Sequence, residues 1–116
     1  MFPLTANQCY FLYREPTDMR KSFNGLSGLI KNELALNPLD GAIYIFINRR
    51  RNRVKLLLWD RTGFVIYYKR LEQGTFELPQ MEATALSCTL NWDQLICILE
   101  GVALESIKRR KRFSMI

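Results

Sequence analysis

The chain has 116 residues, of which 48% are hydrophobic and 24% charged, and its formal net charge is +6. This is the length of one domain and the composition of a globular protein, which excludes a chain that is disordered throughout. It has no histidine, and its three cysteines form no C-x-x-C pair, which excludes His-dependent catalysis and a Cys/His zinc site. We therefore expect no cofactor, no metal and no small-molecule substrate.

The first third of the chain predicts a strand followed by a helix. Residues 8–14 are rich in aromatic side chains and predict the strand. Apolar residues then recur at helical spacing over about 16 residues, namely Met19, Phe23, Leu26, Ile30 and Leu34. Thr17 or Asp18 is the expected N-cap of this helix, and Asn37-Pro38 is expected to end it.

Three strands are predicted in close succession, over Ala42–Asn48, Arg53–Asp60 and Phe64–Leu71. The connections between them are short enough to require antiparallel pairing. Asp60–Gly63 predicts a type I turn with a glycine bulge. With that bulge, one face of the strands is core, and the other carries Trp59 and Tyr67 together with two lysines. A bulge of one residue reverses this alternation, so the sequence alone leaves open which face is buried.

The last third predicts two short strands and a second helix. Phe76–Pro79 and Ser87–Leu90 are the expected edge strands. Asn91 and Gln94 have the spacing of a capping box, and the helix that follows is expected to bury Cys97 and to end at Gly101. The expected fold class is α+β, with a small antiparallel β-sheet (a three-stranded meander plus one or two short edge strands) packed by two helices.

The positive charge is concentrated in two blocks that contain no acid. Residues 49–55 carry five Lys and Arg in seven positions, and residues 108–112 carry five in succession. In the rest of the chain, 7 Lys and Arg are outnumbered by 11 Asp and Glu. Such blocks are typical of a protein that binds a polyanion such as nucleic acid, and the alternative is a solvated surface. We expect residues 1–106 to form one α+β domain and residues 107–116 a flexible basic tail.

The candidate nucleic-acid-binding residues lie in these blocks and on the strand beside the first block. A two-stranded ribbon with an arginine tip, residues 49–53, can enter a DNA groove or straddle phosphates, because a guanidinium binds phosphate bidentately. Trp59 and Tyr67 form the expected stacking or partner-binding face, unless a helix covers that face. The residues expected to bind nucleic acid are Arg49, Arg50, Arg51, Arg53, Lys55, Lys69, Arg70, Lys108, Arg109, Arg110, Lys111 and Arg112.

No group of residues predicts catalysis, so we expect a protein that is not an enzyme. Asp18, Asp40, Asp60 and Asp93 stand beside expected turns or helix starts, where aspartate serves as a cap or a turn residue. A small metal-dependent nuclease that uses Asp18, Asp40 or Asp60 is the remaining catalytic alternative.

Several motifs occur in one order along the chain, namely Pro16–Leu26, Pro38–Gly41, Asn48–Arg53, Lys55–Asp60, Gly63-Phe64, Tyr68–Glu72, Gly74-x-Phe76, Leu99–Gly101 and the basic C-terminus. Together they resemble the TnpB-type accessory proteins, from the second reading frame, of the insertion-sequence sixty-six family of bacterial transposable elements. The resemblance covers about residues 10–112. The resemblance implies that this protein is encoded beside a separate, larger transposase and assists transposition. The family has no agreed catalytic residues, so the resemblance assigns none to this chain.

Two functional hypotheses of different classes follow. The first is an accessory protein for transposition that binds DNA non-enzymatically through the arginine tip and the basic tail. The second is an adaptor that docks on the transposase or another protein of the element without binding DNA itself. The few scattered cysteines, and the lack of an apolar run near the ~20 residues of a membrane span, predict a cytoplasmic protein with no membrane partner.

Overall fold

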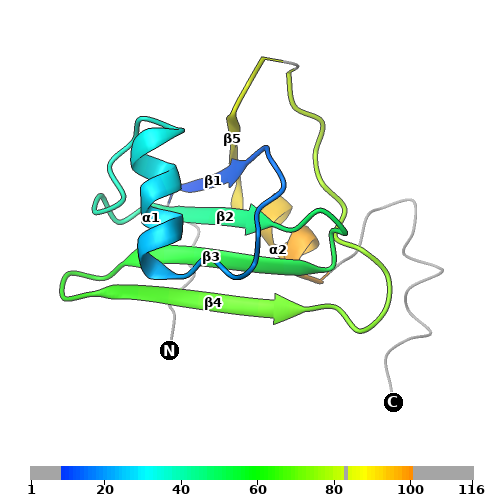
Figure 1. Cartoon of the computed structure of the whole chain (residues 1–116). Coiled ribbons are helices and arrows are strands. Elements are labelled where there is room, and N and C mark those ends of the chain that lie inside the picture. The colour runs from blue at the N-terminus through cyan, green and yellow to red at the C-terminus, as the bar shows by residue number, and fades with distance from the viewer. Residues whose placement is uncertain (1–8, 83, 101–116) are drawn as a thin grey trace.

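The predicted meander and both predicted helices are present in a computed structural model of the chain, which describes residues 9–82 and 84–100. The elements are β1 (Tyr10–Tyr13), α1 (Phe23–Asn32), β2 (Ile43–Ile47), β3 (Arg53–Trp59), β4 (Phe64–Arg70), β5 (Ser87–Leu90) and α2 (Trp92–Glu100). The five strands form one sheet in the order β4-β3-β2-β1-β5 (Figure 1). The predicted α+β fold class is therefore confirmed.

The sheet is mostly antiparallel. β2, β3 and β4 pair as the predicted meander, and β5 pairs antiparallel with β1. β1 and β2 are parallel, because the chain leaves β1, passes through α1 and enters β2 in the same direction. This one parallel pair departs from the wholly antiparallel sheet that the sequence predicts.

Both faces of the sheet carry a buried core, one beneath each helix (Figure 1), while the edge strand β4 is only partly buried. On the α1 face, Tyr44 and Phe46 pack with Leu26 of the helix. On the α2 face, Ile45 and Leu56 pack with Leu95, among others. β2 is buried at every position, so the expectation of a single core face is wrong. The strand pattern alone indicates one covered face, whereas the two helices cover one face each.

The turn between β3 and β4 contains no glycine bulge. The N–H of Asp60 donates to the carbonyl of Gly63 at 3.0 Å, which leaves a loop of Arg61 and Thr62, and Arg61 has φ +81°. A positive φ at the first loop residue alone is the mark of a type II′ turn, which suits the twist of a hairpin. The strands therefore stay in unbroken register, with Leu56 opposite Tyr67 and Trp59 opposite Phe64.

α1 is shorter than the apolar spacing predicts, because the chain before it is held in another conformation. Asp18 binds the backbone N–H of Arg20 at 2.9 Å and its guanidinium as well, so it is not the N-cap. Lys55 Nζ donates to the carbonyls of Met19 and Lys21 at 2.8 Å each, which occupies groups that a longer helix would need. The helix consequently begins at Phe23.

The helix also ends earlier than expected, at Asn32 rather than at Asn37-Pro38. The N–H of Leu34 donates to the carbonyl of Leu29 and that of Leu36 to the carbonyl of Ile30, which closes the last turn. Ala35 has φ +54°, a left-handed conformation that stops the helix before the proline is reached.

The segment between β4 and β5 contains no strand at Phe76–Pro79, so that prediction is wrong. Phe76 is nevertheless 1% exposed and packs in the core on the α2 face. The predicted capping box is confirmed, because Asn91 and Gln94 exchange hydrogen bonds of 2.9 and 2.8 Å between backbone and side chain. Cys97 is exposed, contrary to expectation, while Ile98 is buried instead. Gly101 lies outside the described residues.

Among the residues that the structure describes, no helix is long and apolar enough to cross a membrane.

Candidate nucleic-acid interface

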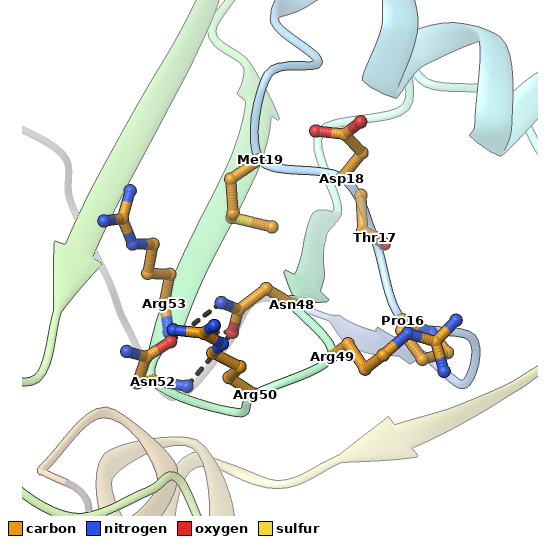
Figure 2. Close-up of a pocket in the computed structure, with 9 residues that line it drawn as sticks. All are labelled: Pro16, Thr17, Asp18, Met19, Asn48, Arg49, Arg50, Asn52 and Arg53. Carbon is orange, nitrogen blue, oxygen red and sulfur yellow. Dashed lines mark hydrogen bonds between the residues drawn. The ribbon is translucent and has the colours of Figure 1, made fainter.

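The arginine tip is built on hydrogen bonds made by Asn48, the residue that follows β2. Its Oδ1 accepts from the backbone N–H groups of Asn52 at 3.0 Å and Arg53 at 2.9 Å, and its Nδ2 donates to Asn52 Oδ1 at 2.8 Å. Its carbonyl accepts from the N–H of Arg51, which has φ +59°. One side chain therefore fixes the two ends of the loop to each other (Figure 2).

The chain that follows β4 supports the tip from a second side. The N–H of Leu71 donates to the carbonyl of Asn52 at 2.8 Å, and the N–H of Phe76 donates to that of Arg51 at 2.6 Å. Because Phe76 is buried in the core, this bond ties the tip to the rigid part of the domain. The arginines thus extend from an anchored backbone rather than from a free loop.

The segment Pro16–Met19 lies beside the tip. The N–H of Thr17 donates to the carbonyl of Ile47 at 2.8 Å, at the end of β2, and the Thr17 side chain is buried. Between this segment and the tip is an open pocket of about 500 Å³. Figure 2 shows Arg49, Arg50 and Arg53 around it. A phosphate group is small enough to enter such a pocket.

Three arginines give the lining of the pocket a positive charge, and its single acid is already paired. Asp18 forms a bidentate ion pair with Arg20, with 2.6 Å between Oδ2 and Nη2. Hydrogen bonds from Arg20 lower the pKa of Asp18 to about 2. The exposed side chains of Arg49, Arg50 and Arg51 form no ion pair or hydrogen bond with any part of the chain that the structure describes. Their charge is therefore available to an anion.

The other predicted basic residues differ in their availability. Lys55 is 8% exposed. Its ammonium donates to two backbone carbonyls, and its Nζ lies over the ring of Tyr68, 4.7 Å from the ring centroid. Lys69 lies on the opposite face of the sheet and donates to the carbonyl of Leu99 in α2. Arg70 is exposed and paired with Glu72 at 2.8 Å. Lys55 and Lys69 thus hold the two helical layers to the sheet rather than forming an exposed basic surface.

The expected face of Trp59 and Tyr67 does not exist, because the register puts the two side chains on opposite faces of the sheet. Trp59 stacks edge-on against Phe64, with 5.1 Å between ring centroids, and Tyr67 packs against the core on the α2 face. The missing bulge is the physical reason for this correction. Lys108, Arg109, Arg110, Lys111 and Arg112 lie outside the described residues.

The aspartates considered for a nuclease serve local structure. Asp40 accepts from the N–H of Ala42 at 2.9 Å and from the hydroxyl of Tyr44 at 3.0 Å. Asp60 belongs to the β3–β4 turn, and Asp18 is paired with Arg20. Within residues 9–82 and 84–100, no three His, Cys, Asp or Glu side chains are grouped so that they could hold a metal ion.

Asn48, Asn52 and Thr17 shape the site without carrying charge, and they are not among the site residues that the sequence predicts. The signal for the asparagines is their position at the two ends of the arginine run, since asparagine favours turns. Tyr68 is a further residue of the site that is not among the predicted ones: its hydroxyl accepts a hydrogen bond from Arg53 Nη1 at 3.0 Å, and the residue is 47% exposed.

Comparison with known proteins identifies a family. A family model described as "IS66 Orf2 like protein" matches residues 8–109. The chain is 32% identical over 102 residues to the uncharacterized protein y4hO of Sinorhizobium fredii, which covers 88% of this chain and 87% of the relative. It is 29% identical over 96 residues to the uncharacterized protein y4jC of the same organism, covering 83% and 80%. No solved structure matches the chain significantly.

Proposed function

The chain belongs to the IS66 Orf2-like family, which supports an accessory role in the transposition of an insertion sequence, and we propose that it fills this role by binding DNA. The arginine tip is the proposed contact surface, and the basic tail adds further phosphate contacts. The protein does no chemistry on the DNA itself in this proposal. It neutralises phosphates and helps to bring the ends of the element to the transposase.

The observation that carries the proposal is the group Arg49, Arg50 and Arg51 on an anchored loop, whose side chains have no partner within the described part of the chain. Like charges held close together repel one another, and that repulsion is relieved when a polyanion binds between them. The hydrogen bonds of Asn48 and Phe76 hold the loop backbone before any ligand arrives, which lowers the entropy lost on binding. Arginine suits this role because its planar group forms two parallel bonds to a phosphate.

A non-enzymatic role is supported by the contacts of two aspartates that were candidates for a nuclease, Asp18 beside the tip and Asp40 before β2. Metal-dependent phosphodiester cleavage needs carboxylates that converge on a metal ion. Asp18 and Asp40 are instead engaged with Arg20 and Tyr44.

The experiment is a binding isotherm of the full chain with labelled DNA, measured by fluorescence anisotropy across a salt series. If six to eight phosphates are contacted, affinity falls by roughly three to four orders of magnitude between 50 and 200 mM salt. The double variant Arg49→Ala/Arg50→Ala weakens binding and reduces the slope of log K against log salt by about two. A chain that ends at Ser106 weakens binding further, because it lacks the basic tail.

The matched control is Lys31→Ala/Arg61→Ala, which also removes two positive charges from exposed positions. Arg61 lies in the turn at the far end of β3 from the arginine tip, so this control should leave most of the affinity and the slope unchanged. Equal losses in the two double variants would show that net charge alone decides binding. No binding by the folded wild-type protein at low salt would contradict the proposal and favour the adaptor that docks on the transposase.

A further inference from the structure

Next to the arginine tip, the end of the β3–β4 ribbon exposes an aromatic ring among cationic side chains. Tyr68 lies on β4, the edge strand, and keeps 47% of its surface exposed. Its cross-strand neighbour on β3 is Lys55, and the residue two positions along β4 is Arg70. No strand covers the outer side of β4 among the described residues, so a planar ligand can approach the ring from that side.

The ring is held in place by its neighbours. Arg53 Nη1 donates to the Tyr68 hydroxyl at 3.0 Å. Lys55 Nζ lies 4.7 Å from the ring centroid and is itself fixed by two backbone carbonyls. A cation on one face of an aromatic ring leaves the opposite face for stacking, and a ring that is already fixed loses little conformational freedom when a base stacks on it.

The ring and the pocket at the tip are joined through one residue. Arg53 lines the pocket with Arg49 and Arg50, and it also contacts the Tyr68 hydroxyl. Arg53 and Arg70 are direct cross-strand partners, an arrangement of like charges that destabilises an empty sheet. Glu72 pairs with Arg70, whereas no ion pair of Arg53 is present in the described part of the chain. A phosphate beside Arg53 would relieve this repulsion.

We propose that Tyr68 stacks on an unpaired nucleobase of a DNA strand whose phosphates contact the arginine tip, so that single-stranded DNA is the substrate class of this site. The inference rests on the proposed function and specifies that the DNA bound at this site is single-stranded. Bases in a duplex present only their edges, while an exposed aromatic ring binds the face of an unstacked base. Stacking of this kind tolerates any base, which gives a preference for single strands without strong sequence preference.

The test is a double-mutant cycle between Tyr68 and the bases of the ligand. The full chain is titrated with a thymidine oligonucleotide of about 12 nucleotides, within the usual range of site sizes, and with an abasic strand of equal length. The wild-type protein should bind the thymidine strand about 5- to 100-fold more tightly than the abasic strand. Tyr68→Thr, which keeps a β-branched residue in the strand, should bring this ratio near one, and Tyr68→Phe should preserve it. Phe23→Leu is the control, because Phe23 is a similarly exposed aromatic residue, at 44%, on α1.

A second measurement uses only the wild-type protein and so does not depend on the folding of a variant. A strand that contains 5-iodouracil should cross-link on irradiation to the peptide that contains Tyr68. An unchanged thymidine-to-abasic ratio in folded Tyr68→Thr, or a cross-link confined to other peptides, overturns the stacking role and leaves phosphate binding by the tip intact. If the wild-type protein binds neither strand at low salt, the proposed function fails together with this inference.

Discussion

Replacing Asn48 with alanine should weaken both the fold and the DNA affinity, because this side chain closes the arginine tip. Asn48→Ala removes three hydrogen bonds, two from backbone N–H groups at 3.0 and 2.9 Å and one to Asn52 Oδ1 at 2.8 Å. The loop then loses the contacts that hold its two ends together, and the arginines extend from a less ordered backbone.

The magnitude follows from the number and burial of these bonds. A neutral hydrogen bond contributes about 0.5–1.5 kcal/mol net, and more when its loss leaves a partner unsatisfied. All three bonds of Asn48 are partly buried, so solvent replaces some of them. We expect the free energy of unfolding to fall by about 2 kcal/mol, a large share of the roughly 5–15 kcal/mol of a typical domain.

Urea denaturation followed by circular dichroism measures this loss. With a slope typical of small proteins, the midpoint should fall by roughly 1 M urea and the slope should not change. Asn48→Asp is the control, because its carboxylate still accepts from the N–H groups of Asn52 and Arg53, and rotation of the Asn52 amide lets its Nδ2 donate to the second carboxylate oxygen. It should keep the unfolding free energy within about 0.5 kcal/mol of wild type while its negative charge lowers DNA affinity. A loss below about 0.5 kcal/mol in Asn48→Ala would refute the reasoning.

Three further predictions test the local structure around the sheet. Arg20 holds the pKa of Asp18 at about 2, below its usual 3.8, so this ion pair contributes to stability above about pH 4 and is lost as the pH falls toward 2. Carboxyl NMR titration should show this pKa, and Arg20→Ala should return it toward 3.8. Arg61 has φ +81°, so Arg61→Gly should raise the free energy of unfolding by about 0.5–1 kcal/mol. Gly63→Ala should be tolerated, because a Cβ there meets nothing within 4 Å, and a loss above about 1 kcal/mol in thermal denaturation would instead indicate the glycine bulge.

Much of the architecture could be predicted from local patterns. The three strands of the meander, the capping box of Asn91 and Gln94, and β5 all lie where the sequence predicts them. Short connections and capping pairs depend on residues only a few positions apart, so contacts with distant segments do not change them. The start of α1 at Phe23 could not be predicted, because the ammonium of Lys55, on a distant strand, binds the backbone that precedes the helix.

The candidate site likewise has a part that the sequence predicts and a part that it does not. The concentration of arginines at one turn is visible in the sequence, and the structure places Arg49, Arg50 and Arg53 around one pocket. The sequence predicts an aromatic face of Trp59 and Tyr67 only through a glycine bulge, and the turn contains no such bulge. One residue of register decides which side chains face each helix, and Tyr68 comes to lie beside Arg53 and Lys55 as a result.

Composition and short-range pattern were therefore sufficient for the α+β class, the meander, the two basic blocks and the resemblance to the family to which the chain belongs. Each of these depends on residues that are near one another along the chain. Only the tertiary structure decided that both faces of the sheet carry a buried core and that Lys55 binds the backbone of the chain before α1. It also decided that Pro16–Met19 lies beside the arginine tip. These outcomes depend on contacts between segments far apart in the sequence, and turn geometry and register determine them.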